Sequence, residues 1–174
     1  MVDFISLHLS EPELFRQSGQ YDDVRVIRDM LDTTTWNVSF PDTVSVHSAA
    51  FCLLIFLNTL TEAVIPQKFQ AQCLEAAGSY SSAIKALAHI PVDHQNLFYY
   101  LTAFLRSCLA LSEKNGTDVQ LLASSFGDVV FRDSLASKKV ARSFPTPPVR
   151  MENTALFMRH FLNNGPAAMF GGLS

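Results

Sequence analysis

Charged side chains are scarce in this sequence. Asp, Glu, Lys and Arg make up 17% of its 174 residues and hydrophobic residues 48%, a balance that argues against a disordered chain. No excess of positive charge is present either, because the net charge is −3 and the pI is near 5.9. DNA- and RNA-binding domains carry a basic surface, so nucleic acid is not expected as a partner.

The sequence also lacks a hydrophobic run that could cross a bilayer. Its longest apolar run, residues 49–57, is far shorter than the roughly 20 residues that a membrane helix needs. Cysteine is rare, with only Cys52, Cys73 and Cys108. Their number is odd, each lies in an apolar helical pattern, and their spacing is not that of metal ligands. We therefore expect free core thiols and a cytoplasmic protein.

Motifs for self-contained catalysis are missing as well. There is no glycine-rich phosphate-binding motif and no nucleophile elbow. The histidines show no ligand spacing backed by a carboxylate, so we expect no metal and no cofactor. If the chain takes part in catalysis, it is expected to lend a group to the active site of another protein. The histidines are His8, His47, His89, His94 and His160.

The hydrophobic pattern predicts an all-α domain of eight or nine helices, because no segment alternates with period two over the length of a strand. Residues 1–163 are expected to form the domain, whose first helix lacks an N-cap as if it began upstream, and residues 164–174 a flexible tail. The expected helices are 2–9, 21–31, 46–59, 66–78, 81–90, 91–115, 117–127 and 153–162.

Particular residues set the expected helix ends. Ser45 is a suitable N-cap for the helix 46–59, whose side chains are apolar nearly all round, which predicts a central buried helix. Thr117 opens a capping-box pattern, and Gly127 is expected to end the helix that follows it. Gly19 can adopt a positive φ in the loop that precedes residue 21.

One arginine stands out in that loop. Arg16 lies between Leu14-Phe15 and Ser18-Gly19. One interpretation is a solvated loop cation, since loops are polar and exposed. The other is a guanidinium presented to a phosphate, because its planar fork of donors matches phosphate oxygens better than a lysine does. The residue pattern alone favours the first.

Two further groups have open interpretations. Trp36 and Phe40 lie on an expected loop, where they are either core anchors or an exposed contact patch. A proline-rich stretch carries four cations that either touch acidic lipid headgroups or form a solvated loop. These cations are Lys138, Lys139, Arg142 and Arg150.

Three segments together resemble the RhoGAP family over roughly residues 2–162. The first, residues 13–19, reads ELFRQSG and is similar to the family's arginine-finger loop. The second, residues 48–66, is similar to a family helix that ends in a Leu-Pro-Glu-Pro-Leu-Ile type connector. The third combines residues 96–105 with 121–127 and resembles the closing helices of the fold. Their common spacing is more specific than any one motif.

Within that family the sequence looks most like the C-terminal RhoGAP-like domain of the type II inositol polyphosphate 5-phosphatases. The resembling residues are 29–33, 46–48, 72–75 and 94–98. This resemblance implies that a phosphatase and an immunoglobulin-like domain lie upstream in the complete protein. It also implies recruitment to endosomal or Golgi membranes through those domains, and endocytic adaptor peptides as further partners.

The family resemblance implies a Rho-type small GTPase, Rac- or Cdc42-like, as the partner and Arg16 as the catalytic finger. Animal members of the phosphatase group are generally regarded as inert because they lack that arginine. Active RhoGAP domains, however, usually carry Lys, Arg and Asn where this sequence has Leu54, Asn58 and Val129. We therefore expect GTPase binding with weak or no activation. The implied GTPase-binding residues are Phe15, Gln17, Leu54, Asn58 and Val129.

Overall fold

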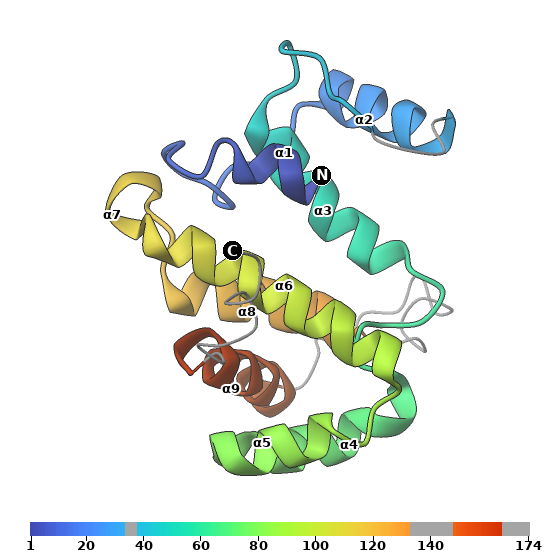
Figure 1. The fold of residues 1–174 in the computed structure, drawn as a ribbon, viewed down its shortest axis with the longest axis vertical. Coiled ribbons are helices and arrows are strands. Elements are labelled where there is room, and N and C mark those ends of the chain that lie inside the picture. Colours follow the sequence, from blue (N-terminus) through green and yellow to red (C-terminus); the bar gives the residue numbers. More distant parts are fainter. Residues whose placement is uncertain (34–37, 133–147, 165–174) are drawn as a thin grey trace, which may run out of the picture. The chain divides into compact units, whose positions relative to one another are not determined.

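The computed structural model describes residues 1–33, 38–132 and 148–164, except for the side chains of 148–151. Every regular element within these residues is helical, which confirms the predicted all-α fold. The α-helices are labelled in Figure 1. The helices are α1 (Val2–Ser6), α2 (Tyr21–Thr33), α3 (Val46–Thr59), α4 (Gln67–Glu75), the 3-10 turn η1 (Ala76–Gly78), α5 (Tyr80–Leu87), α6 (Val92–Ala110), α7 (Ser112–Asn115), α8 (Val119–Val130) and α9 (Pro148–Asn163).

The start of α3 follows the local capping rule. Ser45 has an extended backbone, with φ −68° and ψ 140°, and its Oγ accepts a hydrogen bond from the His47 amide at 3.2 Å. This bond satisfies one of the amides that a helix N-terminus leaves without an intrahelical partner. The predicted N-cap and both ends of this helix are confirmed.

The expectation that α3 is buried all round is wrong for one side of the helix. Ala49, Leu53 and Leu57 repeat every four residues and are at most 4% exposed, so they form the core-facing stripe. Ile55 and Phe56, however, are 39% and 46% exposed. Helix α3 therefore exposes two apolar side chains, Ile55 and Phe56, which its composition alone does not distinguish from the buried ones.

The chain divides into two compact units. The first comprises Met1–Thr61 and Arg106–Asp118, and the second comprises Glu62–Leu105 and Val119–Ser174. In the first unit α3 packs against both α1 and α2 (Figure 1). Helix α6 supplies residues to both units. The predicted boundary between a domain ending at 163 and a tail stays a prediction.

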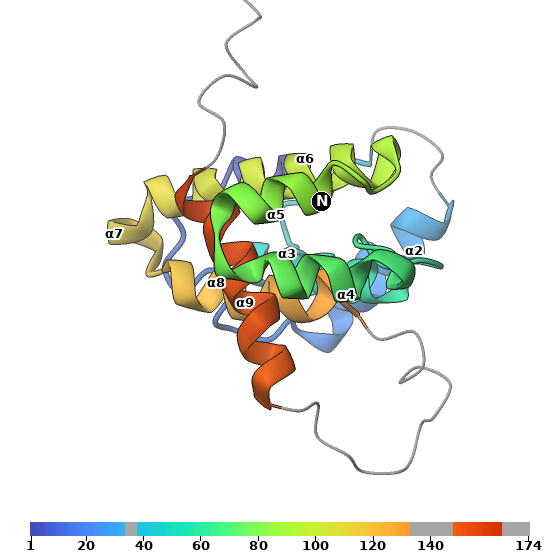
Figure 2. The same ribbon diagram turned by 90° about the horizontal axis from the view of Figure 1, so that it is seen from below.

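In the second unit α8 packs against α9 (Figure 2). Gly127 lies within α8, so the expectation that it ends this helix is wrong. An added Cβ there would lie 3.1 Å from the carbonyl carbon of Thr154 in α9. Gly127 therefore permits the two backbones to approach closely, a role that sequence cannot distinguish from a helix stop.

Aromatic rings fill the core of this second unit. Phe98 of α6 packs edge-on against Phe161 of α9 with ring centroids 4.9 Å apart, and against Phe157 at 6.0 Å. All three side chains are at most 2% exposed. Edge-to-face contacts of this kind add specific geometry to the burial of large apolar surfaces.

The three cysteines are free and buried, as expected. Burial raises the pKa of the Cys73 thiol to about 11 and that of Cys108 to about 12. These thiols remain protonated at neutral pH and act as small apolar core residues. Among the described residues no helix is long and apolar enough to cross a membrane.

Candidate functional site

The loop between α1 and α2 has an unusual backbone. Glu13 and Phe15 have φ values of 62° and 64°, in the left-handed region that residues other than glycine rarely adopt. Between them Leu14 is completely buried, and Phe15 is only 9% exposed. The two bends therefore persist because burial of both apolar side chains compensates their strain. Arg16 follows directly and is exposed.

The base of the loop is tied to residues about a hundred positions later in the chain. The Leu14 amide donates to the Asn115 carbonyl at 3.3 Å. The Asn115 side chain is fully buried, and its Nδ2 donates to the carbonyls of Leu9 and Cys108, both at 2.8 Å. Its Oδ1 accepts from the Thr117 amide at 2.9 Å and hydroxyl at 2.7 Å. Asn115 thus joins the loop between α1 and α2 to the turn between α7 and α8.

The guanidinium of Arg16 contacts the same turn. Nε and Nη2 both donate to the Gly116 carbonyl, at 3.1 and 3.0 Å. Nη2 also donates to the Asp118 carboxylate at 2.9 Å, which forms an ion pair. Gly116 supports this geometry because it adopts φ 70° at the C-terminus of α7. The solvated-cation interpretation is thus incomplete, since Arg16 is exposed but held.

The other end of the loop docks on α3. The Gln20 amide donates to the Ser48 hydroxyl at 3.0 Å, and that hydroxyl donates to the Asp23 carboxylate at 2.8 Å. Asp23 also accepts from the Ser45 amide at 3.0 Å. Gly19 can adopt a positive φ, but it does not do so here. A Cβ at this position would lie 3.1 Å from Cα of Ser48, so the loop passes close to the α3 backbone.

The remaining predicted site residues lie on helices or in the loop itself. Gln17 is exposed beside Arg16. Leu54 is half-buried and Asn58 exposed, one turn apart on α3. Val129 belongs to α8 in the second unit, where its side chain is 6% exposed. The structure thus brings Arg16 together with Gly116 and Asp118, neither of which was predicted as a site residue.

Of the two residues with an open interpretation on the predicted loop, only Phe40 is described. It is buried, and its ring lies edge-on to that of Phe4 at 5.4 Å, so it is a core anchor. Trp36 lies outside the described residues. The predicted cationic stretch does as well, since Lys138, Lys139 and Arg142 are not described and Arg150 is described only as part of α9.

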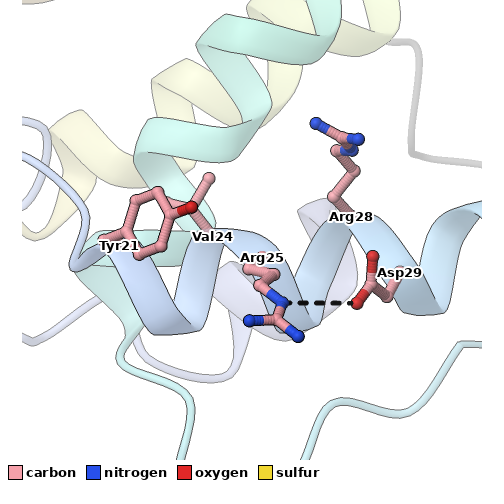
Figure 3. Close-up of a pocket in the computed structure, with 5 residues that line it drawn as sticks. All are labelled: Tyr21, Val24, Arg25, Arg28 and Asp29. Carbon is pink, nitrogen blue, oxygen red and sulfur yellow. Dashed lines mark ion pairs between the residues drawn. The ribbon is translucent and has the colours of Figure 1, made fainter.

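Helix α2 carries a shallow hollow that the sequence did not indicate. It has a volume of about 240 Å³ and is lined by Tyr21, Val24, Arg25, Arg28 and Asp29 (Figure 3). Arg25 approaches Asp29 at 4.0 Å, at the limit of an ion pair, and both side chains are exposed. Tyr21 is 80% exposed at the start of the helix. The hollow therefore places two arginines and one aromatic ring on the part of α2 that follows the loop between α1 and α2.

The signals for Asn115 and Asp118 were present but ambiguous. Asn115-Gly116 is a common way to end a helix, and Thr117-Asp118 resembles an N-cap pattern. Nothing local shows that these residues bind a loop a hundred positions earlier. Among the described residues, no group of three or more His, Cys, Asp or Glu is placed to hold a metal ion.

The RhoGAP domain family model matches residues 1–135, and the chain belongs to this family. Two solved structures share the fold. Human Rho GTPase activating protein 15 superimposes with a TM-score of 0.77 at 18% identity, covering 93% of this chain and 79% of that one. The BH domain of GRAF gives 0.75 at 15% identity, covering 94% and 90%.

Two kinds of curated protein are similar in sequence to this chain. It is 35% identical over 152 residues to the mouse type II inositol 1,4,5-trisphosphate 5-phosphatase, covering 83% of this chain and 15% of that protein. It is 34% identical over 165 residues to mouse Rho GTPase-activating protein 22, covering 89% and 22%. The expected similarity to both is confirmed. The chain spans only about a fifth or less of the length of these relatives.

Proposed function

We propose that this domain binds a small GTPase of the Rho family, of Rac or Cdc42 type, and presents Arg16 to the bound nucleotide. The observation that carries the proposal is the placement of Arg16. It is an exposed arginine in a RhoGAP chain, on a loop held at one end by Asn115 and at the other by Ser48. A loop fixed at both ends limits the entropy that is lost when its arginine enters a partner's active site.

The chemistry of an arginine finger explains what Arg16 would contribute. During GTP hydrolysis negative charge spreads over the transferred phosphoryl group, and an arginine supplied in trans stabilises it. Such a finger increases the rate by about 10³–10⁵, which corresponds to about 4–7 kcal/mol of transition-state stabilisation. A lysine delivers the charge without the planar fork of donors, so Arg16→Lys should recover only part of the effect.

The expected activation is weak for two reasons. Family resemblance implies polar side chains at the positions of Leu54, Asn58 and Val129, and two of these residues are apolar here. Arg16 itself already donates to Gly116 and Asp118. Asn58 and Gln17 are exposed and remain proposed contacts with the GTPase, whereas Phe15 is proposed to act by shaping the loop.

The test is single-turnover GTP hydrolysis by Rho, Rac and Cdc42, each alone and with excess domain. Wild type, Arg16→Ala and Arg16→Lys are compared, with Arg25→Ala as a matched exposed arginine on α2. We expect acceleration that Arg16→Ala removes and Arg25→Ala retains. Titration with GTPase loaded with a non-hydrolysable analogue measures binding separately. Absence of binding to all three GTPases would refute the proposal.

A second function is favoured by the similarity to the type II 5-phosphatase. The domain would then be a recruitment module that binds a GTPase, or an endocytic adaptor peptide, without accelerating hydrolysis. It would thereby place an attached phosphatase domain on endosomal or Golgi membranes. Binding of the GTP-loaded form with equal affinity by wild type and Arg16→Ala, and no acceleration by either, would favour this function over the first.

A further inference from the structure

The contacts of Arg16 engage two of its three guanidinium nitrogens. Nε and Nη2 form the edge that can donate two parallel hydrogen bonds, and both donate to the Gly116 carbonyl. The second proton of Nη2 is directed to Asp118 at 2.9 Å. Of the three guanidinium nitrogens, only Nη1 has no acceptor among the described residues. In this state the arginine can offer a phosphate one nitrogen rather than its bidentate edge.

Asp118 also changes the charge that the finger delivers. Its carboxylate lies in contact with the guanidinium, so the pair has nearly no net charge at the distance of a substrate phosphate. The carboxylate would in addition repel the negative charge that develops on the transferred phosphoryl group. A support that only oriented Arg16 would need a hydrogen-bond acceptor, and the neutral carbonyl of Gly116 already supplies one. It would not need an anion as well.

The pair is weak enough to open. The side chains of Arg16 and Asp118 are 39% and 53% exposed, and exposed ion pairs contribute little because water screens them. A GTPase with a charged nucleotide can therefore compete for the guanidinium. A contact of this strength would reduce the fraction of bound complexes in which the guanidinium is released, without abolishing its release.

We infer that Asp118 is a restraining residue that holds the Arg16 guanidinium on the domain's own α7–α8 turn and so limits GTPase activation. This inference rests on the proposed function, because it assumes that Arg16 is the finger. Its role is positional, since Asp118 acts on the reaction through Arg16.

Two substitutions separate charge from geometry. Asp118→Asn keeps an oxygen that accepts from Nη2 and removes the charge, whereas Asp118→Ala removes both. We expect each to increase the single-turnover rate at saturating domain about two- to fivefold, which corresponds to about 0.4–1 kcal/mol. Affinity for the GTPase loaded with a non-hydrolysable analogue should stay at the wild-type value. Asp32→Asn is the matched control, because Asp32 is an exposed partner of Arg28 at 3.9 Å.

The kinetic outcomes distinguish the restraint from the finger itself. Acceleration that Arg16→Ala removes and both Asp118 variants increase supports the inference. A lower or unchanged rate in the Asp118 variants, with wild-type acceleration still dependent on Arg16, overturns the restraint and leaves the finger in place. Acceleration absent from every variant refutes the finger, and the restraint on activation is overturned with it.

An independent measurement examines the contact without a GTPase. In ¹⁵N NMR spectra of the free domain, the Nη2 protons of Arg16, which donate to Gly116 and Asp118, should exchange with water more slowly than the Nη protons of Arg25. The side chain of Arg25 is 71% exposed and approaches its partner only at 4.0 Å. Asp118→Ala should increase the exchange rate of Arg16 towards that of Arg25. Equal exchange at both arginines in the wild type would contradict the restraint.

Discussion

Replacement of Asn115 by alanine removes the side chain that ties the finger loop to the α7–α8 turn. The carbonyls of Leu9 and Cys108 lose a donor at 2.8 Å, and the Thr117 amide loses an acceptor at 2.9 Å. A buried polar group left without its partner costs about 1–3 kcal/mol. Cys108 retains other donors to its carbonyl, from Leu111 and Thr117. The Leu9 carbonyl and the Thr117 amide therefore carry the cost, and we expect a loss of about 2–6 kcal/mol in the free energy of unfolding.

This loss is large relative to the roughly 5–15 kcal/mol that stabilises a typical domain. Urea denaturation followed by circular dichroism measures it directly, with Asn96→Ala as control because Asn96 is an exposed asparagine on α6. The control should change stability by no more than about 0.5 kcal/mol. Thr117→Val leaves the Nδ2 bonds of Asn115 intact and should be less destabilising than Asn115→Ala. A loss below about 1 kcal/mol for Asn115→Ala would refute the role assigned to this side chain.

Three further predictions concern helix packing, pH and the finger's surroundings. Gly127→Ala should destabilise the domain by about 1–3 kcal/mol because the added Cβ meets the α9 backbone. Gly78→Ala is the control and should have little effect, because a Cβ at Gly78 would have no atom within 4 Å. The midpoints of urea denaturation compare the two variants. Burial raises the pKa of the Cys108 thiol from 9.0 to about 12, so the unfolded chain loses this proton at a lower pH than the folded chain. The free energy of unfolding should therefore fall as the pH rises above 9. Denaturation measured from about pH 8 to 10 should show a less steep fall for Cys108→Ala than for wild type. If polar support limits the finger, Leu54→Lys combined with Asn58→Arg should increase single-turnover GTP hydrolysis over wild type, and an unchanged rate would remove that explanation.

Local sequence rules predicted those parts of the fold that local contacts determine. Ser45 caps α3 because its side chain and the amide it accepts from are two positions apart. The rules failed where distant segments meet. Gly127 and Gly19 were interpreted through backbone conformation, whereas each is required by the backbone of another helix at about 3.1 Å. A glycine has the same sequence signature in both cases.

The candidate site was predictable only in part for the same reason. Arg16 could be selected because its neighbours Leu14-Phe15 and Ser18-Gly19 mark a loop, and the resemblance to RhoGAP domains gave it a role. Its contacts with Gly116 and Asp118 span about a hundred residues, and no periodicity or capping pattern encodes them. The strained φ values of Glu13 and Phe15 likewise follow from burial of the loop and not from residue preference.

The separation in sequence between the loop and its anchor also determines when the loop acquires its shape. Leu14 and Arg16 are synthesised about a hundred residues before Asn115 and Gly116. At about 5–20 residues per second this interval lasts roughly 5–20 s. Throughout it the carbonyls of Asn115 and Gly116 that bind the loop are absent, so the loop between α1 and α2 is among the last parts of the first unit to become ordered. A chain that stops before residue 115 would retain Arg16 but would not hold it in place.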